Sequence, residues 1–456
     1  MWISKKQRAV DYFLSFSVKV FLFFLPWQTV WIQREIFVDG VKWQHATLQF
    51  FLSEALLWLS IVFFMFWYLK EMKKKESTIS LDFSPDRFFV FSVFLFLVYA
   101  FMSAFWAKDS DIAFQQSLRL LASFLFFMAV FFSSFDFKSL LRWLMYGSFL
   151  PALLGLAQFL FQTTWGSSLL GLTEHLASEP GTSILSADLV GRWLRAYGSF
   201  GHPNTFGFYL FLSLMASTLL YVNSKKSLLA NSLLFSVVSL QIMALFFTFS
   251  RSAWLAFVLW LFVLYFHRFF NFNIESVRAK MLCFASLSFV LLLLWSAFPL
   301  VRVRFGFNAP HEIQSIEERL SEYEQAKLLF FQKSVLGQGA GNYTQALYVS
   351  LNKDEISHIE AWRLQPAHNV LLLALVEFGL LGFGLASIAC LSYLFFLRSS
   401  DPSSKRIYFK KLLIFAPPLP FLLLDHQVLS LYPGTILLVL YIGIATRLFL
   451  SKPILS

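Results

Sequence analysis

The sequence contains about twelve apolar runs long enough to cross a lipid bilayer. A membrane-spanning helix needs roughly 20 predominantly apolar residues. The 456-residue chain is 58% hydrophobic and contains 59 Phe, more apolar surface than a soluble domain can bury. We therefore predict an all-α integral membrane protein with about twelve transmembrane helices. The predicted spans lie near residues 11–33, 48–69, 87–106, 112–133, 139–162, 203–222, 228–249, 251–269, 279–300, 368–397, 411–429 and 433–450.

The basic residues sort by side of the membrane. A formal charge of +11 is compatible with nucleic-acid binding, but the Lys and Arg residues concentrate before the first span and in every second connection, as the positive-inside rule describes for cytoplasmic segments. We expect no nucleic-acid partner, cytoplasmic N- and C-termini, and an external segment 301–367. The residues that carry this pattern are Lys5, Lys6, Arg8, Lys70, Lys73, Lys74, Lys75, Lys138, Arg142, Lys225, Lys226, Arg268, Arg278, Lys280, Arg398, Lys405, Arg406, Lys410 and Lys411.

A long polar segment, residues 301–367, interrupts the apolar pattern between the ninth and tenth predicted spans. Ser315-Ile-Glu-Glu318 has the form of a capping box and predicts the start of a helix. That helix is expected to stop before Gly337-Gln-Gly339-Ala-Gly341, a flexible elbow. Pro366 disfavours helix in the residue before it, so a new helix is expected to begin near His368. The segment is thus predicted to be a large, mostly helical external loop that ends with His368 and Asn369 at the top of a membrane helix.

We divide the chain into three parts on this basis. Residues 1–163 hold the first five spans, residues 164–382 form a core that includes the external loop, and residues 383–456 hold the C-terminal spans. The first apolar run is long and lacks a small-residue cleavage site, so we expect a first span rather than a cleavable signal peptide. Cys283 and Cys390 both lie in apolar runs and indicate neither a disulfide framework nor a metal site.

Polar residues gather at the predicted outer ends of several spans. Arg195, His202 and Asn204 end one outer loop, and Ser250-Arg251 forms a very short outer connection. Asp425 lies near the outer end of the eleventh predicted span. Arg251 can also be explained as an interfacial anchor beside Trp254. The fourth predicted span carries Arg119, which stays charged; we expect it to line an internal polar cavity and to contribute to binding of the donor.

This combination of side chains suits a lipid-linked diphosphate. The planar guanidinium groups of Arg195, Arg251 and Arg319 match phosphate oxygens in a bidentate manner. His202 and His368 add groups able to take a proton from a hydroxyl near neutral pH. No carboxylate-rich site for a divalent metal is apparent, so arginine would have to neutralise the charge. The Gly337–Gly341 run does not follow a strand, which argues against a nucleotide-binding loop.

Four short motifs then occur in the order found in one family. These motifs resemble the patterns of O-antigen ligases and the related O-antigen polymerases. They are Arg195…Gly198-Ser-Phe-Gly201-His-Pro203-Asn204; Thr248-Phe-Ser250-Arg251; Glu318-Arg319 followed by Gly337-Gln-Gly339-Ala-Gly341-Asn342; and His368-Asn369 followed by Gly379-Leu-Leu-Gly382. The likeness runs from about Arg192 to Gly382. The first five spans share only hydropathy with the family.

The resemblance implies a multi-pass glycosyltransferase of the bacterial plasma membrane, with its active site facing outward. Its donor would be an undecaprenyl-diphosphate-linked glycan and its acceptor a hydroxyl of a lipid or sugar. By the same similarity Arg195 and Arg251 would hold the diphosphate, His368 would help to deprotonate the acceptor, and no metal or cofactor would be needed. The family includes ligases, polymerases and protein O-oligosaccharyltransferases, and these motifs do not separate them.

A transporter or flippase for lipid-linked sugars is the alternative from another class. It too would use intramembrane charges and arginines for the diphosphate. Such a protein is expected to contain inverted repeats and cavity charges on both sides. We find no convincing internal repeat, and the His368 region favours chemistry on one face. A purely structural membrane scaffold would leave the arginine and histidine clusters without a purpose.

Overall fold

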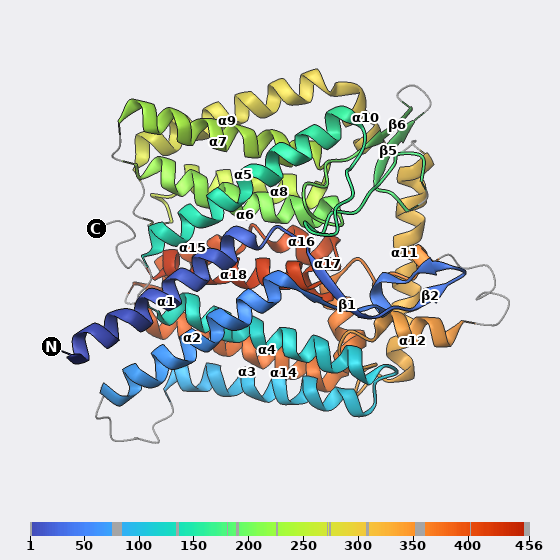
Figure 1. Ribbon diagram of the computed structural model, residues 1–456, viewed down its shortest axis with the longest axis horizontal. Helices are drawn as coiled ribbons and strands as arrows, with labels where there is room; N and C mark the ends of the chain where they lie inside the picture. The colour runs from blue at the N-terminus through green and yellow to red at the C-terminus, as the bar shows by residue number, and fades with distance from the viewer. Residues whose placement is uncertain are drawn as a thin grey trace.

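The computed structural model shows a bundle of long helices that carries a smaller polar layer at one end (Figure 1). The structure describes residues 2–74, 84–133, 136–179, 181–187, 191–224, 227–270, 272, 275–306, 310–351, 361–401 and 403–450. The long helices are α1 (Trp2–Phe24), α2 (Leu52–Lys74), α3 (Pro85–Met102), α4 (Ser110–Phe132), α5 (Phe137–Phe161), α6 (Pro203–Val222), α7 (Leu228–Phe247), α8 (Arg251–Tyr265), α9 (Ser276–Ser296), α14 (Val370–Ser400) and α18 (Tyr432–Phe449).

Nine helices within the described ranges are long and apolar enough to cross a membrane, which makes this a multi-pass membrane protein. The prediction of about twelve such helices is corrected at three places. In the run 11–33, helix α1 ends at Phe24, just before Pro26, and a strand that begins at Val30 follows. The run 251–269 forms only the 15-residue α8.

The third place is the run 411–429, which is not one helix. It is split into the end of α15 (Lys405–Lys411), the 3-10 helix η4 (Leu412–Phe415), α16 (Leu419–Leu424) and α17 (Gln427–Ser430). Pro417, Pro418 and Pro420 explain the break, because proline lacks the N–H that a continuous helix requires. Asp425 and His426 consequently lie in a non-helical gap between α16 and α17.

The prediction of an all-α fold is also corrected, because three small antiparallel sheets accompany the helices. Strand β1 (Val30–Arg34) pairs with β4 (Leu48–Phe51), β2 (Phe37–Val38) with β3 (Val41–Lys42), and β5 (Ile184–Ala187) with β6 (Gly191–Leu194). The β2–β3 turn is Asp39-Gly40, and both residues have positive φ, as a two-residue hairpin requires. The short 3-10 helix η1 (Gln44–Ala46) follows this hairpin. These pairings are local and occur in polar loops, so hydropathy alone does not reveal them.

Local sequence explains where the helices at the polar end begin. Pro203 occupies the first turn of α6, where its missing N–H costs nothing. The Ser250 hydroxyl accepts from the N–H of Ala253 and caps α8. The Asn369 side chain caps α14 in the same way, accepting from Leu372 at 3.0 Å. The helix start predicted near His368 is thus confirmed, one to two residues later.

The predicted external loop contains α10 (Phe298–Phe305), α11 (Pro310–Gln332), α12 (Tyr343–Ser350) and the 3-10 helix η3 (Ala361–Arg363). Residues 307–309 and 352–360 lie outside the described ranges. The capping box predicted at Ser315 is wrong as a helix start, because α11 already begins at Pro310. Proline at the first helical position has its φ preset for a helix, which favours the earlier start.

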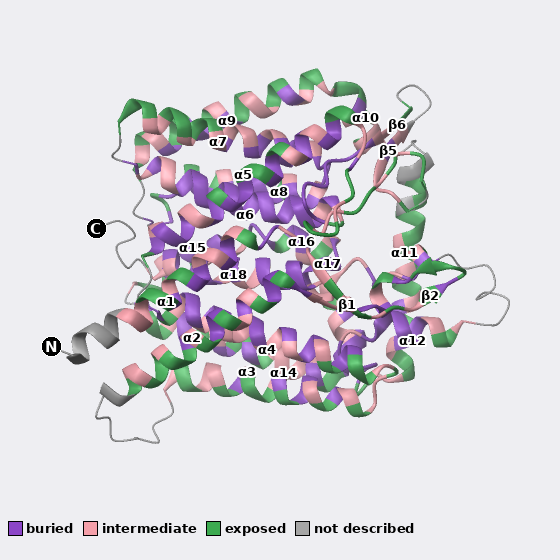
Figure 2. Cartoon of the chain, viewed as in Figure 1, coloured by how far each residue is buried: buried purple, intermediate pink, exposed green. Residues whose placement is uncertain are grey.

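Helix α6 lies at the centre of the bundle, and α9 lies at its edge (Figure 2). Of the α6 span, 89% is buried, whereas the corresponding share for α9 is 28%. Helix α9 exposes large apolar side chains such as Phe284, Leu287 and Leu291. An apolar surface of this kind is typical of helices that face lipid.

A kink in α14 holds the glycine-rich segment that follows α11. Gly379 has φ +62° and ψ −172°, which interrupts the helix. The freed backbone groups bond to the segment around Gly337: Gln338 donates to Val376 at 2.9 Å, Gly339 to Glu377 at 2.8 Å, and Leu380 to Ser334 at 2.8 Å. A Cβ on Gly337 would lie 2.3 Å from the Glu377 carbonyl oxygen, so only glycine fits. The segment predicted as a flexible elbow is therefore tied to the membrane helix by main-chain bonds.

One end of the bundle holds the start of α1, the end of α18 and the short helix α15 (Figure 1). The other end, which is the polar end, holds the three sheets together with α11 and α12. The described basic residues of the predicted cytoplasmic connections, such as Lys405 and Lys410, belong to the first of these ends. Lys75, Lys225 and Lys226 lie outside the described residues.

Candidate functional site

His368 is held by a carboxylate at the polar end. Its Nδ1 lies 2.9 Å from both Oε1 and Oε2 of Glu322, and its backbone N–H donates to Glu322 Oε2 at 3.1 Å. Glu322 comes from the middle of α11, and both side chains are largely buried. A carboxylate only accepts hydrogen bonds, so Nδ1 must carry the proton. In the neutral ring this leaves the Nε2 lone pair of His368 available to accept one.

Two further histidines continue from His368 as a row of rings. The His426 ring is 4.8 Å from the His368 ring in an edge-to-face arrangement, and the His45 ring is 5.6 Å from that of His426. Nδ1 of His426 lies 2.7 Å from the Ser430 hydroxyl. The three imidazoles come from η1, from the gap before α17 and from the start of α14. Tertiary packing thus gathers three titratable rings from distant parts of the chain.

Asp425 joins three segments that the sequence had marked separately. Its Oδ1 accepts from Asn204 Nδ2, and its Oδ2 accepts from the Ser252 hydroxyl at 2.7 Å. Asn204 Oδ1 in turn accepts from Arg195 Nη2 at 2.7 Å. Arg195 Nε donates to the Thr248 carbonyl at 2.7 Å. One hydrogen-bonded network therefore joins the starts of α6 and α8, the segment after β6, and the gap between α16 and α17.

His202 caps α6 inside this network. Its Nδ1 accepts from the N–H of Asn204 at 3.1 Å, and its Nε2 lies 3.1 Å from the Ser183 hydroxyl. Burial lowers the pKa of His202 well below its usual value, and the nearby positive charge of Arg195 lowers it further. A neutral ring that accepts at Nδ1 carries its hydrogen on Nε2. His202 is thus a structural cap that donates to Ser183.

Arginine side chains surround the turn between α7 and α8. Arg251 is the first residue of α8, Arg195 bonds Thr248, and Arg304 Nε donates to the Phe249 carbonyl at 2.9 Å. Phe249 has φ +46°, an unusual value for a bulky residue that marks strain in this turn. Arg319 on α11 acts electrostatically on Asp425 and His426. Arg195 and Arg304 act electrostatically on His202, so positive charge reaches the histidines from more than one segment.

Four of the residues predicted from the sequence bond within the protein, to groups outside the His368–Glu322 pair. Glu318 is exposed and bonds Gln314 on its own helix at 2.9 Å, so its neighbour Glu322 takes the place beside His368. Arg119 is buried and forms an ion pair with Glu54 at 3.3 Å. Asn369 uses its oxygen to cap α14, and its nitrogen lies 3.4 Å from the Leu423 carbonyl. Ser250 likewise acts as the cap of α8.

The described residues contain no group of three His, Cys, Asp or Glu side chains with the geometry of a metal site. Cys283 and Cys390 are free thiols. The functional groups at the polar end are thus imidazoles, guanidinium groups, carboxylates and amides. They can bind an anion and exchange a proton.

Comparison with known families adds an independent observation. The family model described as O-antigen ligase matches residues 234–387. Residues 234–387 thus match an O-antigen ligase domain. No curated protein matches the chain.

The O-antigen ligase domain contains the central pair of the site and part of its surroundings. His368, Glu322, Arg251 and Arg319 lie within the matched residues. Arg195, His202, Asn204, Asp425 and the other two histidines of the row lie outside them, so the site is completed by segments before and after the domain. The resemblance inferred from the motifs is confirmed for residues 234–387.

Three members of the site were not predicted from the sequence: Glu322, Arg304 and His45. Glu322 had a usable signal, because it follows Arg319 by three residues and Glu318 by four on one helix, where such residues are neighbours. Arg304 lies in the external segment, but no motif includes it. His45 sits in a loop more than 300 residues before its partners, and nothing in the local sequence marks it.

Proposed function

We propose that the protein is a membrane glycosyltransferase that moves a glycan from an undecaprenyl-diphosphate carrier to a hydroxyl acceptor. The observation that carries this proposal is the His368–Glu322 pair beside a group of arginines. A general base and an anion site are the two requirements of this transfer. The O-antigen ligase domain supports the proposal, because its family uses lipid-linked glycans.

In this proposal the arginines around the α7–α8 turn bind the diphosphate. Arg195 is fixed by Thr248 and Asn204, so its guanidinium group is positioned before the donor arrives. Arg251, Arg304 and Arg319 add positive charge at the same end of the molecule. Positioned guanidinium groups stabilise the negative charge that develops on a leaving diphosphate. Arg119 is left out of this donor site, because Glu54 already compensates its charge.

The base in this proposal is Nε2 of His368. It takes the proton of the acceptor hydroxyl while the hydroxyl oxygen forms a bond with the anomeric carbon of the donor sugar. The bond between that carbon and the diphosphate oxygen breaks, and the lipid diphosphate leaves with the bonding electrons. Glu322 holds the ring in the required tautomer and offsets the charge of the imidazolium that forms. Asp425 supports the arrangement through Asn204 and Ser252.

We further propose that this chemistry takes place at the outer face of the bacterial plasma membrane, with both chain ends in the cytoplasm. The sorting of basic residues supports this orientation. The polar end then meets the external side, where a lipid-linked glycan and its acceptor are both within reach. A polymerase or a protein O-oligosaccharyltransferase would use the same machinery with a different acceptor.

The decisive experiment supplies purified protein in lipid nanodiscs with an undecaprenyl-diphosphate glycan and a set of candidate acceptors. These are a lipid A–core glycolipid, a second lipid-linked repeat unit and a serine-containing peptide. Mass spectrometry of the products should show one acceptor extended by the glycan, with lipid diphosphate released. The reaction should persist in excess EDTA, because no metal takes part in the proposed steps. Movement of the intact lipid-linked glycan between leaflets without any covalent product would instead indicate a transporter.

A further inference from the structure

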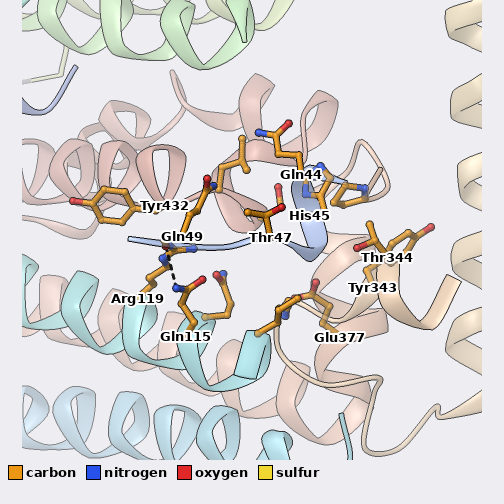
Figure 3. Close-up of a pocket in the computed structure, with 16 residues that line it drawn as sticks. Gln44, His45, Thr47, Gln49, Gln115, Arg119, Tyr343, Thr344, Glu377 and Tyr432 are labelled. Carbon is orange, nitrogen blue, oxygen red and sulfur yellow. Dashed lines mark hydrogen bonds between the residues drawn. The ribbon is translucent and has the colours of Figure 1, made fainter. Parts of the chain in front are cut away.

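A polar pocket is lined in part by His45, the last histidine of the row (Figure 3). It contains about 570 Å³ of space between atoms, part of it open to solvent. One wall is the loop segment 44–49, a second is the first turns of α4, and a third combines Tyr343 and Thr344 with Glu377 of α14. A concave site with several convergent polar groups is typical of small-ligand sites.

The lining of this pocket is dominated by uncharged hydrogen-bonding groups. Gln44, Gln49, Gln115 and Gln116 contribute four amides, to which Thr47 and Thr344 add hydroxyl groups. The Gln115 amide nitrogen donates to the Gln49 carbonyl at 3.0 Å, and that of Gln116 donates to the Leu429 carbonyl at 2.6 Å. The amide oxygens can still accept.

The charged groups of the pocket offer little to an anion. Arg119 is compensated by Glu54 and donates to the Gln49 carbonyl at 2.7 Å. Glu377 is a carboxylic group that accepts from the N–H of Gly341 at 2.9 Å. A negatively charged ligand would meet this carboxylic group and no uncompensated guanidinium group. The lining therefore suits a neutral ligand with many hydroxyl groups.

His45 connects this pocket to the proposed base. It lines the pocket, and its ring lies 5.6 Å from that of His426, which lies 4.8 Å from that of His368. His202 lies within electrostatic reach of His368 and of two arginines, Arg195 and Arg304. His368 thus has both a neutral, amide-rich pocket and a positively charged region in its neighbourhood.

We propose that this pocket binds an uncharged sugar residue of the acceptor. This assignment rests on the proposed function, because it names where the acceptor lies relative to the donor. The amides and hydroxyl groups pair with sugar hydroxyls, and the neighbouring histidines lie between the bound sugar and the diphosphate. The acceptor hydroxyl then reaches His368 from the pocket, past His45 and His426.

Sugar binding is tested without any transfer reaction. Saturation-transfer NMR is recorded on the full-length protein in nanodiscs with the methyl glycosides of glucose, galactose, mannose and N-acetylglucosamine. At least one glycoside should receive saturation. Gln44→Trp fills the mouth of the pocket from an exposed position and should abolish this signal. Gln115→Leu keeps the size of the side chain and should weaken the signal by removing an amide.

Gln332→Trp is the matched control, because Gln332 is exposed at the end of α11 and bonds only Ser350 among the described residues. It should leave the NMR signal unchanged. The absence of saturation transfer to every glycoside, or equal signals from the wild type and both pocket variants, would overturn the assignment. Displacement of a bound glycoside by inorganic diphosphate would overturn it as well, since it would make the pocket an anion site.

Kinetics separate this inference from the proposed function. With the acceptor found in the transfer experiment, Gln115→Leu should raise the acceptor KM about tenfold, as expected for one lost hydrogen bond, while the donor KM stays unchanged. A rise in the donor KM alone would assign the pocket to the donor. If the wild type transfers no glycan but the pocket still binds a glycoside, the proposed reaction fails and the sugar site stands.

Discussion

Glu322 bonds both the ring and the backbone of His368, although 46 positions separate the two residues in the sequence. Its Oε1 and Oε2 each lie 2.9 Å from Nδ1, and Oε2 also accepts from the His368 N–H at 3.1 Å. One carboxylate thereby fixes the tautomer of the ring and the entry into α14. This arrangement makes Glu322 a positioning residue in the proposed reaction.

Replacing Glu322 with Gln tests that role. The amide keeps the size of the side chain but loses the charge that offsets the imidazolium, so kcat should fall by about 100-fold or more. The donor KM should change little, because the arginines remain in place. Glu324→Gln is the control, since Glu324 is exposed and pairs only weakly with Lys327 at 3.7 Å. An equal effect of the two substitutions would remove Glu322 from the mechanism.

Arg251→Ala and Arg251→Lys test the diphosphate site. Loss of charged hydrogen bonds should weaken binding of undecaprenyl diphosphate by about 10- to 100-fold in the Ala variant. Lys should restore only part of it, because it lacks the planar fork of arginine. Native mass spectrometry in detergent measures the binding. Arg302→Ala is the control, because Arg302 is exposed on α10, two residues before Arg304. Wild-type binding by the Lys variant would show that a point charge suffices.

The protein should lose stability as the pH falls below about 6.5. Burial and the neighbouring His368 lower the pKa of His45 from 6.5 to about 4. Between these values the unfolded chain binds a proton that the folded chain does not, so the free energy of unfolding decreases as the pH falls through this window. Above pH 6.5 this contribution is fully present.

Thermal unfolding of the wild type and of His45→Gln at pH 7 and pH 5 checks this expectation. Tm of the wild type should fall more than that of the variant, which has no imidazole at position 45. His368 and His426 face His45 and are present in both proteins, so the difference between the two decreases in Tm isolates the contribution of His45. An identical decrease in Tm between pH 7 and pH 5 in the two proteins would mean that protonation of His45 is not linked to folding.

Gly379→Ala should destabilise the protein by about 1–3 kcal/mol, because an L side chain is strained at positive φ. Its φ is +62°, and a Cβ there would lie 2.4 Å from the Val335 carbonyl oxygen. Gly384, on the same helix, has no atom within 4 Å of a Cβ position, so Gly384→Ala should be neutral or slightly stabilising. Tm in detergent compares the two variants. A Gly379→Ala protein as stable as Gly384→Ala would show that the kink is not required.

The orientation in the membrane is tested with single cysteines in a protein that lacks Cys283 and Cys390. Glu324→Cys on α11 should react with a membrane-impermeant maleimide in intact spheroplasts, because α11 is proposed to face outward. Lys405→Cys on α15 should react only after the membrane is opened. Both positions are exposed. The reverse pattern would place the site on the cytoplasmic side and contradict the proposed reaction.

Local sequence properties were enough to predict the membrane class, most of the spans and the helix starts at Pro203 and Arg251. An apolar run of about 20 residues must enter a bilayer as a helix, and a serine or proline at the right position starts one. The short family-like motifs are local as well, which is why the resemblance to O-antigen ligases could be stated before the fold was known.

Which of the polar residues meet depends on tertiary packing. Glu318 and Glu322 are both glutamates of α11, and only the packing of that helix against the start of α14 brings Glu322 to His368. His45 reaches the site because the loop after β3 folds over the polar end, more than 300 residues away in sequence from its partners. The run 411–429 is apolar enough for a span, yet its prolines break it and place Asp425 in the network. Hydropathy and spacing describe segments one at a time, whereas a site depends on the contacts between segments.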